Sequence, residues 1–276
     1  MNKVILKTLR LMLPKIIHQI APANKDIWHV MWHKCYESWQ EHFTDYEFKL
    51  WDDDQELDAF VKSKYPDLYQ TYLSCPIHII KIDFARLLIL NYYGGMYVDM
   101  DMYCYKDFTD DLNNQICLIG SPWRNEKVNN CLMAGVSNHD FWKTHINDVK
   151  NNIDTIDHRK LFTIDGVEDV NISNDEVLHI AGPYALLNSY NSYPNKSEIT
   201  ILPSEEFQQD WLYYGPEIKT RHFMTGRWGR EYYEVLQRRH KETFPELTEK
   251  EYEVIEFYGF RQINMDNFDF KTNYNT

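Results

Sequence analysis

Most residues of the segment from residue 77 to residue 93 are apolar. A run of this length that is apolar on nearly every side predicts a long helix buried on most of its faces. Pro76 fits the first turn of this helix, because a proline nitrogen has no hydrogen to leave unpaired there. Gly94 and Gly95 then supply the backbone freedom with which a helix ends. We expect this helix to be the central element of the fold.

Elsewhere the chain alternates short apolar runs with longer amphipathic segments. Strands are expected at residues 16–20, 46–51, 96–101, 116–120, 131–136 and 199–202. Helices are expected at residues 26–42, 54–64, 69–75, 141–152, 184–190, 231–241 and 248–257, with an irregular excursion at 151–174. This alternation predicts an α/β fold with a mainly parallel sheet and helices on both faces. No low-complexity linker divides the 276 residues, so we expect one domain, with a core at 14–230 and a C-terminal helical extension at 231–276.

Two carboxylates, Asp99 and Asp101, continue the alternation of Met96, Tyr97 and Val98 at the carboxyl end of one expected strand. Residues two apart on a strand point to one face, and ligands of parallel sheets collect at the carboxyl ends of strands. Because neighbouring carboxylates repel each other, a divalent cation is expected between them, and oxygen ligands suit Mn²⁺ or Mg²⁺. Asp83 and Arg86 stand three apart on the buried helix and are expected to reach the same site.

Parts of this pattern have simpler explanations. An Asp-x-Asp at a strand end can be a solvated edge, and an i,i+3 ion pair on a helix contributes little to stability. A phosphatase of the Asp-x-Asp-x-Thr kind would need a threonine at position 103, which is Tyr103. An EF-hand starting at Asp99 would need a glutamate at position 110, which is Asp110. The phosphatase and EF-hand alternatives are therefore disfavoured.

The combined spacing resembles the signature of the DXD-motif glycosyltransferases. The resemblance lies in Asp83-x-x-Arg86 followed by Gly-Gly-x-Tyr-x-Asp-x-Asp at residues 94–101, and it extends over residues 14–230. The group includes initiating mannosyltransferases, capsular polysaccharide glycosyltransferases and, more distantly, the clostridial glucosylating toxins. It implies a GT-A fold, which is a Rossmann-like, mainly parallel sheet flanked by helices, here with additional C-terminal helices.

The same resemblance implies roles for the acidic residues. Asp99 and Asp101 would bind the metal ion, with His222 as a further ligand. Asp83 and Arg86 would hold hydroxyls of the donor sugar, and Asp99 would also contact the donor. We therefore expect Asp83, Arg86, Asp99 and Asp101 to be the catalytic residues.

Three further residues would bind the donor by this resemblance. His18 and Gln19 end the first expected strand, where the family contacts the base; alternatively, they are polar side chains satisfied within the strand. Trp228 would donate its indole N–H to the β-phosphate. The chain departs from the family at Arg227, where the family has serine, and at Ala21, where many relatives have tryptophan.

The implied activity is that of a metal-dependent hexosyltransferase. It would move a sugar from a nucleotide-sugar, for which we expect a UDP-sugar, to a glycan, lipid-linked or protein acceptor. The family retains the anomeric configuration, and no residue stands out as a carboxylate nucleophile of the retaining-glycosidase kind, so front-face displacement is favoured. The alternatives are a non-catalytic nucleotide-sugar- or glycan-binding protein, and a transferase effector that glycosylates a protein.

Composition narrows the partners and the compartment. A net charge of −13 argues against a nucleic-acid-binding protein, which needs a basic surface. The five cysteines are odd in number, scattered and without Cys-x-x-Cys spacing, which indicates reduced, intracellular thiols. Residues 1–13 are too short to span a bilayer, and no stretch reaches 18 apolar residues, so no transmembrane segment is expected. We expect a cytoplasmic protein, with peripheral membrane contact through the N-terminus left open.

Overall fold

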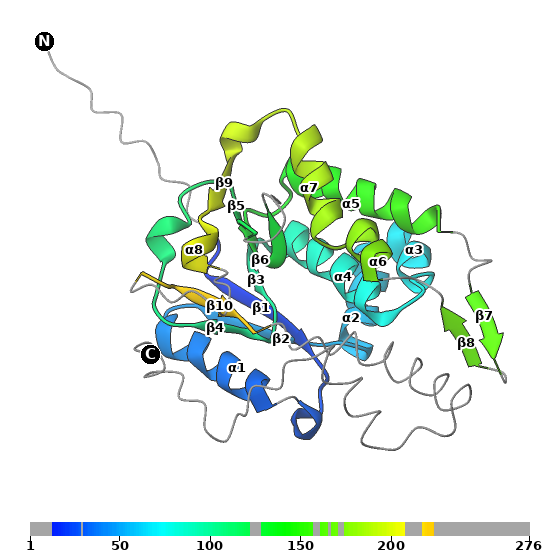
Figure 1. The fold of residues 1–276 in the computed structure, drawn as a ribbon, viewed down its shortest axis with the longest axis horizontal. Helices are drawn as coiled ribbons and strands as arrows, with labels where there is room; N and C mark the ends of the chain where they lie inside the picture. The colour runs from blue at the N-terminus through cyan, green and yellow to red at the C-terminus, as the bar shows by residue number, and fades with distance from the viewer. Residues whose placement is uncertain are drawn as a thin grey trace, which may run out of the picture.

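A six-stranded sheet forms the centre of the computed structural model (Figure 1). The structure describes residues 13–28, 30–121, 128–156, 161–164, 167–170, 174–207 and 217–223. The strand order is β2 (Glu47–Asp52), β1 (Ile16–Ala21), β3 (Gly95–Val98), β6 (Asn129–Gly135), β5 (Ile116–Ile119) and β9 (Ile199–Leu202). β6 is antiparallel to its neighbours β3 and β5, and the other strands are parallel to one another. The predicted α/β fold with a mainly parallel sheet is confirmed.

Helices cover both faces of this sheet (Figure 1). One face carries α4 (His78–Tyr93), α5 (Asp140–Asp154) and α7 (Pro183–Ser192), together with α2 (Gln55–Lys64), α3 (Tyr69–Leu73) and α6 (Asn174–Ile180). The other face carries α1 (Val30–His42) and α8 (Ser204–Phe207). Successive side chains of β3 point to opposite faces of the sheet. Tyr97 therefore belongs to the hydrophobic core under α4, whereas Met96 and Val98 belong to the core under α1.

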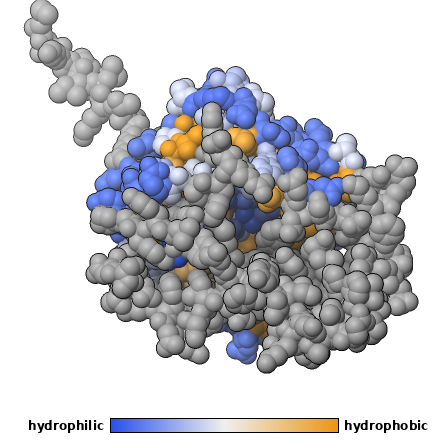
Figure 2. All heavy atoms as spheres, in the orientation of Figure 1, coloured by the Kyte–Doolittle hydropathy of each residue, from blue (hydrophilic) through white to orange (hydrophobic). Residues whose placement is uncertain are grey.

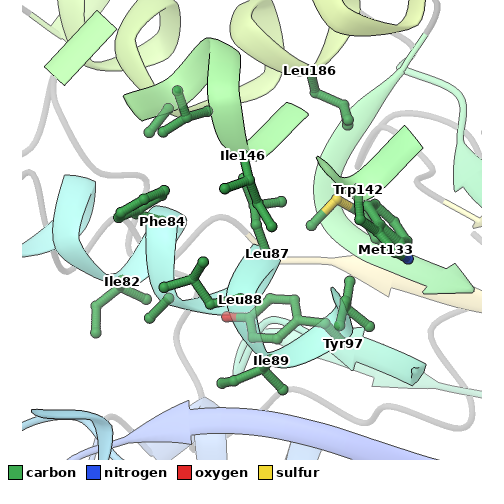
Figure 3. Close-up of a cluster of buried hydrophobic side chains, with 14 of the residues drawn as sticks. Ile82, Phe84, Leu87, Leu88, Ile89, Tyr97, Met133, Trp142, Ile146 and Leu186 are labelled. Carbon is green, nitrogen blue, oxygen red and sulfur yellow. The ribbon is translucent and has the colours of Figure 1, made fainter. Parts of the chain in front are cut away.

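The helix α4 is buried as its apolar sequence predicts. Every residue from 82 to 90 is buried, including Asp83 and Arg86. Figure 3 shows its side chains gathered with Tyr97 of β3 and Trp142 of α5 in one apolar cluster. In the face shown in Figure 2, by contrast, most of the described surface is hydrophilic. Asp83 and Arg86 are thus two charged side chains that α4 holds inside the protein, where each needs a partner.

The two ends of α4 differ in how well the sequence predicted them. The helix begins at His78, with an extended Ile77 as its N-cap, so the prediction that Pro76 occupies the first turn is wrong. At the other end Gly94 and Gly95 have φ values of 66° and 91°, as expected. A Cβ on Gly94 would lie 2.7 Å from the Ser137 nitrogen, so side chains are excluded there by space as well as by backbone conformation.

Other boundaries also depart from expectation. The helix expected at residues 26–42 starts as a 3₁₀ turn at Lys25–Ile27, and an extended Trp28 separates this turn from α1. The irregular excursion expected at 151–174 contains the end of α5 and an antiparallel ribbon of β7 (Leu161–Ile164) and β8 (Val167–Val170). The two strands lie within a mostly polar segment, which is why the sequence predicted an irregular excursion there. The expected C-terminal extension and its helices lie outside the described residues.

All five cysteines are free thiols, as their spacing predicts. Burial raises the pKa of each of them. Over the part of the chain that the structure describes, no helix is both long enough and apolar enough to cross a membrane.

Candidate functional site

Asp99 and Asp101 lie in a turn at the carboxyl end of β3. The strand stops at Val98, and the Met102 nitrogen donates to the Asp99 carbonyl at 3.1 Å to close the turn before β4 (Met102–Cys104). The prediction that Asp99 and Asp101 lie in a strand and share one of its faces is therefore wrong, because the two residues lie in a turn. The turn nevertheless brings the two carboxylates together.

A third ligand group arrives from the far end of the described chain. β10 (Thr220–His222) pairs antiparallel with β4 and places His222 opposite Met102. One ligand atom each from Asp99, Asp101 and His222 lies within 4.8 Å of the other two, and His222 Nε2 is 3.1 Å from Asp101 Oδ1. Two carboxylate oxygens and an imidazole nitrogen at this spacing can hold a divalent metal ion.

Arg86 connects this cluster with the buried helix. Its Nη2 lies 2.7 Å from Asp83 Oδ1, and its Nη1 lies 3.2 Å from Asp99 Oδ1. The side chain of Asn130 on β6 donates to Asp83 Oδ1 at 3.3 Å, and the main-chain carbonyl of Asn130 accepts from Arg86 Nη1 at 3.0 Å. The pair on α4 is thus not an isolated ion pair but part of one hydrogen-bonded group with Asp99.

Tyr97 completes the surroundings of Asp99. Its hydroxyl donates to Asp99 Oδ1 at 2.9 Å, and the Arg86 guanidinium lies 4.5 Å from the centre of its ring. Tyr97 was not among the predicted site residues. It stands two residues before Asp99 at the end of β3, and this spacing is the signal that could have identified it.

The site contains more negatively than positively charged groups. Three ionised carboxylates and one guanidinium sum to −2, and a protonated His222 brings this sum to −1. Burial raises the pKa of Asp83 to about 7 although Arg86 opposes it, and burial likewise raises the pKa of Asp99. Burial lowers the pKa of His222, but Asp101 and Cys131 outweigh it and hold this pKa well above its usual value. A divalent cation would supply the missing charge.

His18 is engaged on both ring nitrogens inside the protein. Trp51 donates its indole N–H to His18 Nδ1 at 3.3 Å, so Nε2 carries the hydrogen and donates to the Gly94 carbonyl at 3.0 Å. Burial lowers the pKa of His18 to about 4 and keeps the ring neutral. The side chain therefore ties β1 to β2 and to the turn that ends α4. A direct contact of His18 with the donor stays a prediction.

The Gln19 side chain, unlike that of His18, makes no hydrogen bond among the described residues. Its side chain is buried beside Leu50, and neither amide atom has a hydrogen-bond partner among the described residues. An unpaired buried amide is costly, which makes Gln19 a candidate for contact with a bound molecule. Its role in donor binding also stays a prediction. The predicted contact from Trp228 lies outside the described residues, as does Arg227.

Comparison with known proteins gives this geometry a family context. Residues 29–119 match the family described as glycosyltransferase sugar-binding region containing DXD motif. This segment includes Asp83, Arg86, Asp99 and Asp101, whereas His222 lies beyond it.

Two yeast proteins illustrate the relatives. The chain is 34% identical over 140 residues to a mannosyl phosphorylinositol ceramide synthase of Saccharomyces cerevisiae, covering 50% of this chain and 36% of that protein. It is 35% identical over 94 residues to inositol phosphoceramide mannosyltransferase 3 of Schizosaccharomyces pombe, covering 34% and 26%. The chain thus matches only 36% and 26% of the length of these two relatives.

A solved structure supports the fold. The ligand-free glycosyltransferase domain of the YGT toxin superposes with a TM-score of 0.51 at 9% sequence identity, covering 69% of this chain and 80% of that domain. The α/β architecture of this chain is therefore that of the GT-A glycosyltransferases.

Proposed function

We propose that this chain, which carries a DXD-type sugar-binding region, is a glycosyltransferase that moves a hexose from a nucleotide-sugar to an acceptor hydroxyl. The observation that carries the proposal is the convergence of two groups at one sheet edge. Asp99, Asp101 and His222 form a cluster with metal-ligand spacing, and Arg86 links Asp99 to Asp83 on the buried helix. A solvated Asp-x-Asp would need none of these partners.

The metal dependence is part of the proposal. Asp99, Asp101 and His222 would hold Mn²⁺ or Mg²⁺, and the net charge of the site favours a divalent ion. When bound, such an ion acts as a Lewis acid that neutralises charge on a leaving diphosphate. Among the described residues, the contacts of Asp99 go to Oδ1, from Tyr97 and from Arg86, which leaves Oδ2 for the ion.

Asp83 and Arg86 would orient the donor sugar. Within the described residues, the hydrogen bond and ion pair of Asp83 both go to Oδ1, which leaves Oδ2 to accept from a sugar hydroxyl. Arg86 Nε is buried and has no partner among the same residues, so it can donate to an oxygen of the donor. These two residues thus offer one acceptor and one donor.

The reaction is proposed to retain the configuration at the anomeric carbon by front-face displacement. The acceptor hydroxyl would attack as the diphosphate leaves and takes its proton. The protein then contributes positioning and electrostatic stabilisation, and no covalent intermediate is needed. Because the yeast relatives are named as enzymes that mannosylate inositol phosphoceramide, mannose is the first sugar to test and a lipid-linked hydroxyl the first acceptor.

The test is a screen of nucleotide release by the full chain. UDP- and GDP-sugars are each incubated with Mn²⁺, with Mg²⁺ or with EDTA. We expect metal-dependent release from one donor, abolished in Asp101→Asn and retained in Asp140→Asn, a control in which the substituted side chain is exposed and pairs with Lys143. Donor binding without any release would instead favour the non-catalytic binding protein. Release that needs an added host protein as acceptor would favour the effector.

A further inference from the structure

The strand β4, which follows the Asp99–Asp101 turn, is paired on one side only within the described residues. On that side the Phe223 nitrogen donates to the Asp101 carbonyl at 2.9 Å. In an antiparallel ladder the next pair, Met102 with His222, is then a non-hydrogen-bonded pair. The main-chain groups of Met102 consequently point away from β10, so the ladder does not hold them.

Two side chains of α1 take the place of a neighbouring strand there. The indole N–H of Trp39 donates to the Met102 carbonyl at 2.7 Å. The Ser38 hydroxyl accepts from the Cys104 nitrogen at 2.9 Å and donates to the Cys35 carbonyl at 2.6 Å. Trp39 is fully buried and Ser38 nearly so. The outer edge of β4 is therefore fixed to α1 by two buried hydrogen bonds.

The Trp39 ring is itself held in place on several sides. It stacks on Phe43 at a centroid distance of 5.5 Å and meets the edge of Phe108 at 5.9 Å. Its N–H consequently has one direction available, toward Met102. Because the packed ring has little freedom to move, its N–H fixes the position of the Met102 carbonyl that it binds.

We propose that Trp39, assisted by Ser38, is a positioning residue of the metal site. Met102 directly follows Asp101 and lies opposite His222, so the Trp39 bond sets how far apart the Asp101 carboxylate and the His222 imidazole stand. The hydrogen bond of Trp39 goes to the backbone of Met102 and not to a ligand side chain, so Trp39 acts through that backbone. The inference rests on the proposed metal site and adds to it the part of the protein that holds its ligands at binding distance.

The chain offers a matched control for this residue. Trp142 of α5 is also fully buried, and it donates its indole N–H to the Val136 carbonyl at 3.1 Å. It belongs to the core on the α4 side, whereas Trp39 belongs to the core under α1. Trp39→Phe and Trp142→Phe therefore remove the same kind of hydrogen bond, and only the first removes it beside the metal ligands.

The experiment measures the Mn²⁺ dissociation constant of the full chain by electron paramagnetic resonance. We expect Trp39→Phe to weaken binding by about tenfold or more, as for other residues that orient metal ligands. We expect Trp142→Phe to bind as the wild type does, although both variants melt at a lower temperature. Pulsed resonance should show the nitrogen coupling from His222 reduced in Trp39→Phe alone. Equal affinity in Trp39→Phe and wild type, or equal weakening in both variants, would overturn the inference.

Two further outcomes keep the proposals separable. If the wild type binds no Mn²⁺, the proposed metal site fails and this inference fails with it. If the wild type binds Mn²⁺ while Trp39→Phe keeps full affinity, only this inference fails.

Should Trp39→Phe not fold, Ser38→Ala serves instead, because it removes the bond to Cys104 N and keeps the indole. A few-fold weaker affinity in Ser38→Ala supports the inference, and an unchanged affinity contradicts it.

Discussion

Arg86 Nη1 lies 3.2 Å from Asp99 Oδ1, so a residue in the middle of a buried helix contacts the first acid of the Asp-x-Asp turn. The two residues are thirteen positions apart, and the helix end, the glycine pair and β3 lie between them. Burial of α4 thus determines where the guanidinium stands, and the guanidinium in turn orients the carboxylate. The packing of the hydrophobic core therefore determines the geometry of the site.

This relationship predicts a severe effect of Arg86→Lys. Lysine keeps the charge but has no planar fork to contact Asp83 and Asp99 together. We expect nucleotide release to fall by about a hundredfold, since small misplacements of reacting groups have effects of this size. The free energy of unfolding should also fall, because either the buried Asp83 or the partly exposed Asp99 loses its partner. Steady-state kinetics and urea unfolding measure both, and a variant as active as the wild type would contradict the role given to Arg86.

Tyr97→Phe should weaken the site without disturbing the core. The substitution removes the hydroxyl that donates to Asp99 Oδ1 and keeps the ring against Arg86. We expect a loss of about 1 kcal/mol in unfolding free energy and a weaker affinity for Mn²⁺. Calorimetric titration with Mn²⁺ measures the second effect.

Tyr72→Phe is the matched control for that variant. The Tyr72 side chain is fully buried, and its hydroxyl has no hydrogen-bond partner among the described residues. Removing it should leave Mn²⁺ affinity unchanged and stability equal or higher. If both variants lost metal affinity equally, the effect of Tyr97 would not come from its bond to Asp99.

Gln19→Leu should separate stability from donor binding. The substitution replaces a buried amide that has no partner among the described residues by an apolar side chain of similar size. We expect the melting temperature to stay equal or rise, while the affinity for the donor nucleotide falls. Thermal unfolding and titration with UDP and GDP give the two numbers. A lower melting temperature with unchanged nucleotide affinity would mean that Gln19 serves the fold.

His18 predicts a loss of stability on acidification. Its pKa is about 4 in the folded chain and 6.5 in the unfolded chain, so between these values the unfolded chain binds the additional proton. The free energy of unfolding is therefore highest above pH 6.5 and decreases as the pH falls toward 4. The shift corresponds to about 3 kcal/mol.

His18→Asn tests this prediction, because asparagine does not titrate and offers a donor and an acceptor. Urea unfolding between pH 4.5 and pH 7 should show a shallower pH dependence in the variant than in the wild type. His179→Asn, at an exposed position, is the control and should keep the wild-type slope. Identical slopes for all three proteins would exclude His18 as the source.

Much of this architecture follows from local patterns in the sequence. The mostly apolar run predicted a helix buried on most sides, and the glycine pair predicted its end, because both depend on the segment alone. The Asp-x-Asp turn was taken for a strand, since a strand and a turn of three residues look alike in sequence. The error lay in the local conformation and left the expected pairing of carboxylates intact.

Contacts between distant segments were harder to foresee. Nothing near Trp39 in the sequence indicates that its indole binds the Met102 carbonyl, sixty-three positions away. The contact of Asn130 with Asp83 likewise depends on distant segments, because it forms only where β6 lies beside β3. His222 was named through the family resemblance, and the ribbon of β4 and β10 supplies the physical reason for its position.

The most direct test of the central claim is a titration of the purified chain with Mn²⁺ in the presence of a nucleoside diphosphate, comparing wild type with Asp101→Asn. The account predicts one site in the wild type that the nucleotide tightens, and its loss in the variant. Equal binding by both proteins, or no binding by the wild type, would contradict it.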